Sequence, residues 1–256
     1  MSFDANRTGT GTAEWSEQTE NISKGCINDC LYCYAAANAV RFKQRERSEW
    51  PIEALTKKAD IKSYPKRNGV IMFPSSHDIT PYNLEVYTRV AKLVLQAGNQ
   101  LLIVSKPRLE CIEHLIAELV PWKAQILFRF TIGSLDATMC KFWEPGAPCP
   151  DERIRALKLA HGCGYQTSVS IEPMLEGLDM TCDIVEEVED CVTETIWIGK
   201  MNKPRQRVDK YYLEGVFRVE HQQRDSEILD LYDLLKGHAK VRWKDSIKGV
   251  VSRCAP

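Results

Sequence analysis

The sequence predicts an α/β fold in which a parallel sheet is covered by helices. Short, continuously apolar runs alternate along the chain with segments whose apolar residues recur at helical spacing. This alternation is expected for strands that crossover helices bury on both faces. About six such units follow one another, which predicts an open or closed (β/α) barrel. An open Rossmann-like sheet is the alternative, disfavoured by the lack of a G-x-G-x-x-G motif at the first turn.

The elements follow in a regular order. The predicted strands occupy residues 69–75, 100–106, 125–134, 166–174, 195–201 and 240–246. The predicted helices occupy residues 84–98, 108–120, 151–164, 183–190 and 226–238. Gly98 and Gly237 supply helix stops, Ser226 supplies an N-cap, and Pro107 and Pro150 precede helix starts. Functional residues are expected at the carboxyl ends of the strands.

The first unit is predicted to end at Ser23–Cys26, on the loop that leads into the first helix. That position would place the neighbouring cysteines on the active face of the sheet.

Length and composition fit an ordinary globular protein. The chain has 256 residues, of which 44% are hydrophobic and 27% charged, and its formal net charge is −1. Binding to nucleic acid would therefore need a local basic patch. The polar N-terminus has no apolar h-region, and no apolar run reaches the ~18 residues of a membrane span. We expect a cytoplasmic protein with no membrane association, a flexible segment at 1–18 and a single domain at 19–256.

Three of the ten cysteines, Cys26, Cys30 and Cys33, lie close together. A disulfide is disfavoured by the expected compartment and by the odd number. Structural zinc usually takes four ligands, and the nearest histidine downstream is His77. A [4Fe–4S] cluster normally takes four thiolates, so this triplet would ligate three irons and leave the fourth open. The other seven cysteines are scattered and are expected to be mostly buried small hydrophobic residues.

The spacing C-x3-C-x2-C, with Tyr32 before the last cysteine, resembles the signature of the radical S-adenosylmethionine (SAM) superfamily. The stretch Arg129–Met174 resembles the spore-photoproduct-lyase-like (DNA repair photolyase-like) branch of that superfamily. It carries a strand with Arg-Phe-Thr at 129–131, a Trp-Glu-Pro-Gly turn at 143–146 and a following helix with an early arginine. The resemblance spans about residues 20–175.

The resemblance implies a partial (β/α)6 TIM-type barrel of the radical SAM core and an enzyme of lyase or oxidoreductase type. Its cofactors would be a [4Fe–4S] cluster, held by Cys26, Cys30 and Cys33, and SAM. Reductive cleavage of SAM would yield a 5′-deoxyadenosyl radical that abstracts hydrogen from a substrate. An external electron donor of the flavodoxin or ferredoxin type would supply the electron.

The same resemblance implies contacts to SAM. Tyr32 would pack beside the adenine, Ser76 would hold the amino group, and Lys106 would pair with the carboxylate. Thr131 or Ser134 would contact the ribose or the methionine end. The alternatives are an ordinary strand-end lysine at 106 and a strand-forming threonine that fills the barrel at 131.

Glu172 stands at another strand end, where Pro173 terminates the strand. Its carboxylate would bind the SAM ribose hydroxyls or a substrate cation. The alternative is an interior carboxylate paired with Arg129. At the next strand end, Lys200 and Asn202 are expected on the same face, where they would contact substrate.

One motif departs from the lyase pattern. The lyase ends its second strand in Cys-Thr-Ser-Asp and uses that cysteine as a hydrogen donor, whereas residues 75–78 here are Ser-Ser-His-Asp. His77 and Asp78 are therefore predicted as a proton-transfer pair, with a polar residue leading into the next helix as the alternative for His77. Cys140 is the candidate replacement hydrogen donor, and a buried thiol in a helix is the alternative.

Three basic stretches, residues 41–47, 57–67 and 203–210, lie near the predicted active face and have aromatic residues nearby. They would contact a nucleic-acid backbone, with aromatic side chains stacking on bases, or they form an ordinary solvated surface. The leading hypothesis is a radical SAM enzyme acting on nucleic acid or a nucleotide, with substrate delivered by a partner protein. The alternatives are the same chemistry on a peptide or small metabolite, or a non-catalytic iron–sulfur or zinc protein that binds a partner.

Overall fold

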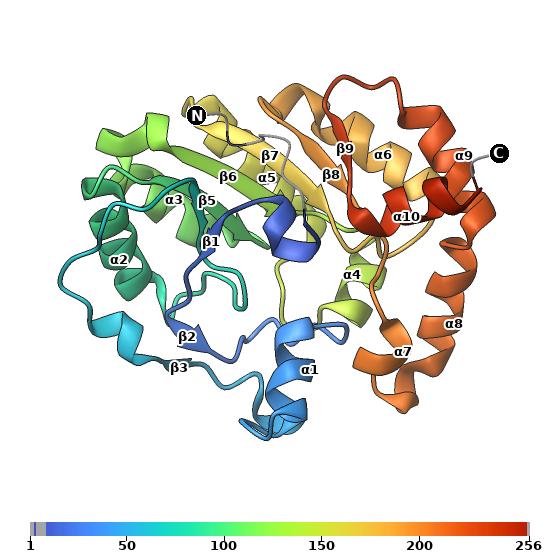
Figure 1. Cartoon of the computed structure of the whole chain (residues 1–256), viewed down its shortest axis with the longest axis horizontal. Coiled ribbons are helices and arrows are strands. Elements are labelled where there is room, and N and C mark those ends of the chain that lie inside the picture. The colour runs from blue at the N-terminus through green and yellow to red at the C-terminus, as the bar shows by residue number, and fades with distance from the viewer. Residues whose placement is uncertain (1–2, 4–8, 255–256) are drawn as a thin grey trace.

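A computed structural model describes residue 3 and residues 9–254, and its main feature is a parallel sheet of seven strands in the order β1-β4-β5-β6-β7-β8-β9 (Figure 1). The strands are β1 Gln18–Thr19, β4 Val70–Met72, β5 Gln100–Ser105, β6 Ile126–Thr131, β7 Gln166–Ile171, β8 Ile196–Ile198 and β9 Val241–Trp243. Neighbours in the sheet follow chain order with no reversal, so this is a half-barrel rather than a doubly wound sheet. The predicted fold class is confirmed.

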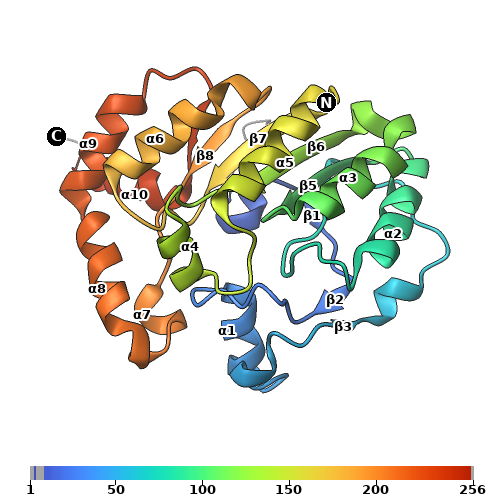
Figure 2. The ribbon, with the colours of Figure 1, turned by 180° about the vertical axis from the view of Figure 1, so that it is seen from behind.

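Ten α-helices accompany the sheet within the described residues: α1 Tyr34–Arg41, α2 Leu84–Gln96, α3 Leu109–Glu118, α4 Ala137–Trp143, α5 Pro150–Gly162, α6 Leu178–Val188, α7 Pro204–Arg207, α8 Leu213–Gln222, α9 Asp225–Leu235 and α10 Asp245–Cys254. Figure 2 shows α2, α3, α5 and α6 in front of the sheet, which they cover on its outer face. None of these helices is both long and apolar enough to cross a bilayer.

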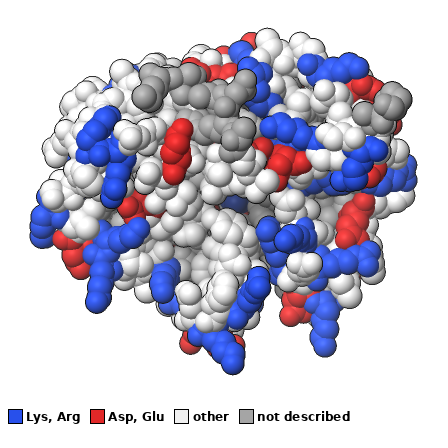
Figure 3. Space-filling model, viewed as in Figure 1, with Lys and Arg blue, Asp and Glu red and all other residues white. Residues whose placement is uncertain are grey.

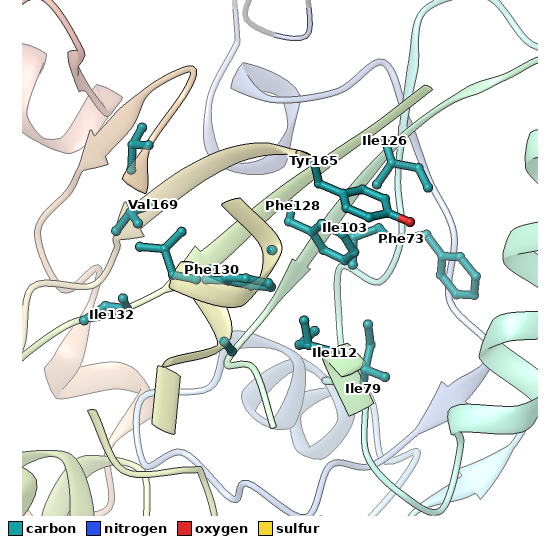
Figure 4. Packing of buried hydrophobic residues seen from close by; sticks show 14 of the residues in the cluster. Phe73, Ile79, Ile103, Ile112, Ile126, Phe128, Phe130, Ile132, Tyr165 and Val169 are labelled. Atoms are coloured by element: carbon teal, nitrogen blue, oxygen red, sulfur yellow. The ribbon is translucent and has the colours of Figure 1, made fainter. Parts of the chain in front are cut away.

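The main core lies between the sheet and the covering helices (Figure 4). Phe128 and Phe130 of β6 point into it, and the Phe128 ring meets Tyr165 edge-on with centroids 5.2 Å apart. Leu127, directly before Phe128, belongs instead to a separate buried cluster that includes Trp15 and Trp197. Alternation of side chains along a strand explains this division. Both faces of β6 are buried, as its continuous apolar sequence predicted.

The first unit differs from the prediction. The strand that joins the sheet is β1, whereas Ser23–Lys24 forms a separate strand, β2, paired antiparallel with β3 Ala54–Leu55. Both β1 and β2 have only two residues, too few for a visible apolar period. The α9 helix, Asp225–Leu235, has Arg224 as its N-cap, two residues before the predicted cap at Ser226.

A short 3-10 helix, Gly11–Glu14, lies beside the last strand of the sheet. Its Glu14 carboxylate is 2.7 Å from the Lys244 ammonium, and Lys244 also donates to the Gly11 carbonyl at 2.7 Å. Trp15 packs edge-on against Trp197 of β8 at 6.1 Å. Residues 1, 2 and 4–8 of the predicted flexible segment lie outside the described residues, and the domain boundary at residue 19 stays a prediction.

Candidate functional site

A cavity of about 460 Å³ opens where the carboxyl ends of the strands meet the cysteine loop. It is lined by all of the predicted site residues except Ser134 and Cys140. Those lining residues are Cys26, Cys30, Tyr32, Cys33, Ser76, His77, Asp78, Lys106, Thr131 and Glu172. Lys200 and Asn202, expected on the same face, also line it. Its volume falls within the ~300–1,000 Å³ typical of small-molecule sites.

The cysteine loop connects β2 to α1 and rests on the turn that follows α4. The Leu31 amide donates to the Trp143 carbonyl at 2.9 Å, and the Gly146 amide donates to the Asn28 carbonyl at 3.1 Å. A Cβ built on Gly146 would lie 2.0 Å from the Ile27 carbonyl oxygen, so only glycine allows this approach. The Trp-Glu-Pro-Gly turn therefore packs against the cysteine loop and holds it in position.

The three thiols line one cavity, and two of them, Cys26 and Cys33, also have local partners. Cys26 Sγ lies 3.8 Å from Asp78 Oδ2, and Cys33 Sγ accepts from the Ala36 amide at 3.4 Å as the N-cap of α1. Within the described residues no group of three His, Cys, Asp or Glu side chains is already arranged around a metal position. Three thiols from one loop fit the donor set of a cluster, and side-chain rotation about χ1 would free them to ligate.

Asp78 connects the cysteine loop to the end of β5. Its Oδ1 accepts from the Lys106 amide at 2.6 Å and from Ser105 Oγ at 2.8 Å, and its Oδ2 accepts from Asn28 Nδ2 at 2.9 Å. Burial acts to raise the pKa of Asp78, but the nearby Lys106 ammonium and these hydrogen bonds outweigh it and lower the pKa. Asp78 is therefore a partly buried, ionised side chain that holds two walls of the cavity together.

Lys106 belongs to a buried charge network behind the cysteines. Its ammonium lies 3.8 Å from the Glu144 carboxylate and 5.6 Å from the centre of the Tyr32 ring. Tyr32 donates its hydroxyl proton to Glu144, whose other oxygen accepts from Arg153. Burial acts to lower the pKa of Lys106, but Cys30, Glu144 and Asp78 outweigh it and raise the pKa. The cavity therefore contains a fixed positive charge.

His77 is buried, and both of its ring nitrogens have partners. Nε2 accepts from the amides of Ile22 and Ser23 at 3.2 and 3.3 Å, so the proton is assigned to Nδ1, which lies 2.9 Å from the Asp78 carbonyl. Burial lowers the pKa of His77. These contacts tie the start of β2 to the end of β4, and a proton-transfer role for His77 stays a prediction.

Glu172 lies at the end of β7, and its partner is not the one suggested by the sequence. Its Oε2 is 3.5 Å from Lys244 Nζ, and burial raises the pKa of Glu172 despite that lysine. Arg129 instead donates to Ser168 Oγ at 2.9 Å and lies over the rings of Trp15 and Trp197. The pairing of Glu172 with Arg129 is therefore wrong, because the guanidinium points into the aromatic cluster of the barrel interior.

Two predicted residues lie outside the cavity lining. Ser134 is fully buried, donates its hydroxyl proton to Glu176 and accepts from the Asp136 amide at 2.9 Å. Cys140 lies in α4 with its Sγ 3.5 Å from the Ser134 carbonyl, and burial raises its pKa to about 12. Both have the surroundings of structural residues, and their predicted roles stay predictions.

Several functional candidates were not found from the sequence. Trp15 lines the cavity from the N-terminal segment, and Arg207 lines it from α7. Lys244 has no exposed surface, although lysine is almost never fully buried without a partner. Trp15 and Arg207 come from segments with no strand-end motif. Lys244 lay inside the last predicted strand, at 240–246, and in the structure it directly follows β9.

The fold resembles that of two radical SAM enzymes of known structure, spore photoproduct lyase and SuiB. Among solved structures, spore photoproduct lyase superposes with a TM-score of 0.56 and 15% identity, covering 87% of this chain and 74% of the lyase. A lyase structure with bound AdoMet and dinucleoside spore photoproduct gives the same values. Streptococcus suis SuiB bound to S-adenosylmethionine has a TM-score of 0.54 and 12% identity, covering 88% of this chain and 49% of SuiB.

Sequence relatives add little about function. The uncharacterized protein ORF301 of Acidianus two-tailed virus is 26% identical over 194 residues, or 70% of this chain. The chain spans 63% of the length of that viral protein. No family model matches the chain.

Proposed function

We propose that the protein is a radical SAM enzyme that begins its reaction by abstracting hydrogen from a substrate. One observation carries the proposal most strongly. Cys26, Cys30 and Cys33 line the same cavity as Lys106, at the carboxyl edge of a half-barrel with the radical SAM fold. When bound, a [4Fe–4S] cluster on these cysteines would supply the electron that cleaves SAM to a 5′-deoxyadenosyl radical.

Different side chains of the cavity would bind different parts of SAM. The Lys106 ammonium would pair with the SAM carboxylate, and the Tyr32 ring beside it would pack against the adenine. Glu172, at another strand end, would accept hydrogen bonds from the ribose hydroxyls. Ser76 and Thr131, which also line the cavity, would contact the amino group and the ribose. Tyr32 and Thr131 are buried, which helps to exclude water from a reactive radical.

The direct test is anaerobic reconstitution with iron and sulfide. We expect a brown protein that cleaves SAM to 5′-deoxyadenosine when it is reduced, first with dithionite and then with a donor of the flavodoxin or ferredoxin type. A colourless zinc protein without SAM cleavage would contradict the proposal. Transfer of deuterium from a labelled substrate into 5′-deoxyadenosine would separate catalysis from uncoupled cleavage.

A peptide substrate is the second candidate, because SuiB, which shares the fold, is known in a structure bound to its precursor peptide SuiA. Nucleic acid or a nucleotide remains the first candidate, because a lyase of the same fold binds a dinucleoside. Stimulation of SAM cleavage by an oligonucleotide or by a peptide would distinguish them.

Lys106 gives a quantitative prediction. Replacing it with methionine keeps much of the side-chain volume but removes the charge proposed to bind the SAM carboxylate. We expect Lys106→Met to raise the Kd for SAM roughly 10- to 100-fold, the range of a charged hydrogen bond, while iron content is retained. Equilibrium dialysis with labelled SAM measures this change. Lys92→Met, on the surface of α2, should bind SAM like the parent, and equal affinities in both variants would rule out the assigned role.

A further inference from the structure

A second hollow of about 690 Å³ lies between α1 and the β2–β3 pair. Figure 1 shows α1 below the sheet, with β2 and β3 beside it. The hollow shares four lining residues with the SAM cavity, namely Tyr34, Ala35, Trp50 and Ser76. We call it the α1 groove, and its remaining lining residues are Ser23, Lys24, Asn38, Ala39, Phe42, Gln44, Arg45, Ala54, Leu55, Thr56 and Lys57. A ligand in the groove would reach directly to the edge of the cavity.

The charged residues of the α1 groove have one sign. Lys24, Arg45 and Lys57 line it, and no Asp or Glu is found among its described lining residues. Lys24 and Lys57 are exposed, and neither has a carboxylate partner within residues 9–254. Arg45 is fixed in place, because its Nη1 donates to the Ile52 carbonyl at 2.5 Å and to the Lys24 carbonyl at 3.3 Å. The groove is therefore a positive surface on a chain whose net charge is −1.

Aromatic side chains lie on the same surface. Phe42 lines the groove with 62% of its surface exposed, and the Arg41 guanidinium lies 5.5 Å from its ring centre. Tyr34, 39% exposed, stands where the groove meets the cavity. Exposed aromatic rings next to cations are the combination that binds single-stranded nucleic acid, since bases stack on the rings and phosphates contact the cations.

The three basic stretches of the sequence now have separate positions. Residues 41–47 and 57–67 each contribute to the α1 groove, through Arg45 and Lys57. Residues 203–210 contribute Arg207, which lines the SAM cavity from α7. In Figure 3 several Lys and Arg side chains lie along the lower part of the face, where α1 and α7 are found in Figure 1.

We propose that the α1 groove binds the phosphate backbone of a nucleic-acid strand and so presents an adjoining nucleotide to the SAM cavity. The inference rests on the proposed function, and it narrows the substrate to a nucleotide within a polymer rather than a free nucleotide. The exposed Phe42 favours a nucleic acid over an acidic peptide. The carboxylates of an acidic peptide would pair with the lysine and arginine side chains but would leave the Phe42 ring exposed to water.

The test measures binding of fluorescein-labelled oligothymidylate of 20 nucleotides to the reconstituted full chain by fluorescence anisotropy. Contacts to about three phosphates predict a slope near −2 for log K against log salt concentration. We expect Lys57→Glu to weaken binding about threefold or more and to flatten that slope. We expect Phe42→Ala to weaken binding roughly fivefold or more through lost stacking.

Two matched controls separate the groove from the rest of the surface. Arg155→Glu changes the charge by the same amount on α5, which covers the outer face of the sheet and does not line the groove. Phe217→Ala removes an exposed ring, 53% accessible, that also lies under an arginine, with Arg205 at 5.2 Å. Both controls should bind like the parent. Polyglutamate and a duplex of equal length serve as competitors, and the single strand should compete best.

The proposal fails if the oligonucleotide does not bind with salt dependence, if groove and control variants lose affinity equally, or if polyglutamate competes better than the single strand. SAM cleavage measured on the same preparation keeps the two proposals apart. Cleavage without oligonucleotide binding would overturn the groove alone, whereas binding without an iron–sulfur cluster or cleavage would overturn the proposed function.

Discussion

Single replacement of Cys26, Cys30 or Cys33 by alanine is expected to abolish SAM cleavage and the near-400 nm absorbance of the reconstituted protein. Among the described residues, no cysteine other than these three lines the cavity. A cluster normally has a protein ligand for each of at least three irons. Iron analysis, visible absorbance and chromatographic detection of 5′-deoxyadenosine would measure the loss. We expect cleavage to fall to the background of the protein-free reaction.

Cys182→Ala is the matched control, since Cys182 is a partly buried free thiol on α6, outside the cavity lining. It should keep its cluster and its activity. Retention of iron and cleavage in any of the three loop variants would contradict the assignment of that cysteine.

Glu144→Ala is expected to be the most destabilising of the substitutions considered. The side chains of Glu144 and Arg153 have 0% and 1% exposure, and Tyr32 and Lys106 also contact this carboxylate. Removing one partner of a buried pair leaves the other charge without compensation, at a cost of about 3–5 kcal/mol. In a chain of this size that corresponds to a fall in Tm of roughly 6–20 °C. Thermal unfolding followed by circular dichroism would measure it.

Glu118→Ala provides the comparison for this loss. Glu118 pairs with Lys92 at the surface, at 2.5 Å and with 44% of its side chain exposed, so its removal should leave the free energy of unfolding nearly unchanged. Equal effects of the two substitutions would show that the Glu144 network contributes no more than a surface ion pair.

The fold was largely predictable because its strands are buried on both faces. The runs at 100–106 and 125–134 could be recognised as strands, since six consecutive residues of β6 are buried against helices on one face and the barrel interior on the other. The two-residue β1 and β2 could not be recognised, because a period of two needs at least four residues to show. The helix α7 could not be predicted either, because its four residues are too few to show a helical period.

The site residues that could be predicted are those that directly follow a strand, because the end of a strand alone places them at the cavity. Lys106 and Glu172 follow their strands directly and line the cavity. Partners that come from distant parts of the chain were not predictable. Glu172 meets Lys244, and Glu144 meets both Tyr32 and Arg153, because barrel closure and loop packing decide these contacts. Local sequence does not indicate which interior cation will lie beside which carboxylate.

The contact between Glu14 and Lys244 has a consequence for the order in which the molecule is assembled. The segment around Glu14 leaves the ribosome early, yet its buried lysine partner is synthesised 230 positions later. Thr10, Gly11, Thr12 and Trp15 also form part of the cavity wall. Contacts of such high sequence separation form slowly, after the elements between them. The growing chain therefore cannot complete this wall of the cavity until Lys244 has been translated, which delays retention of any ligand until the sheet is complete.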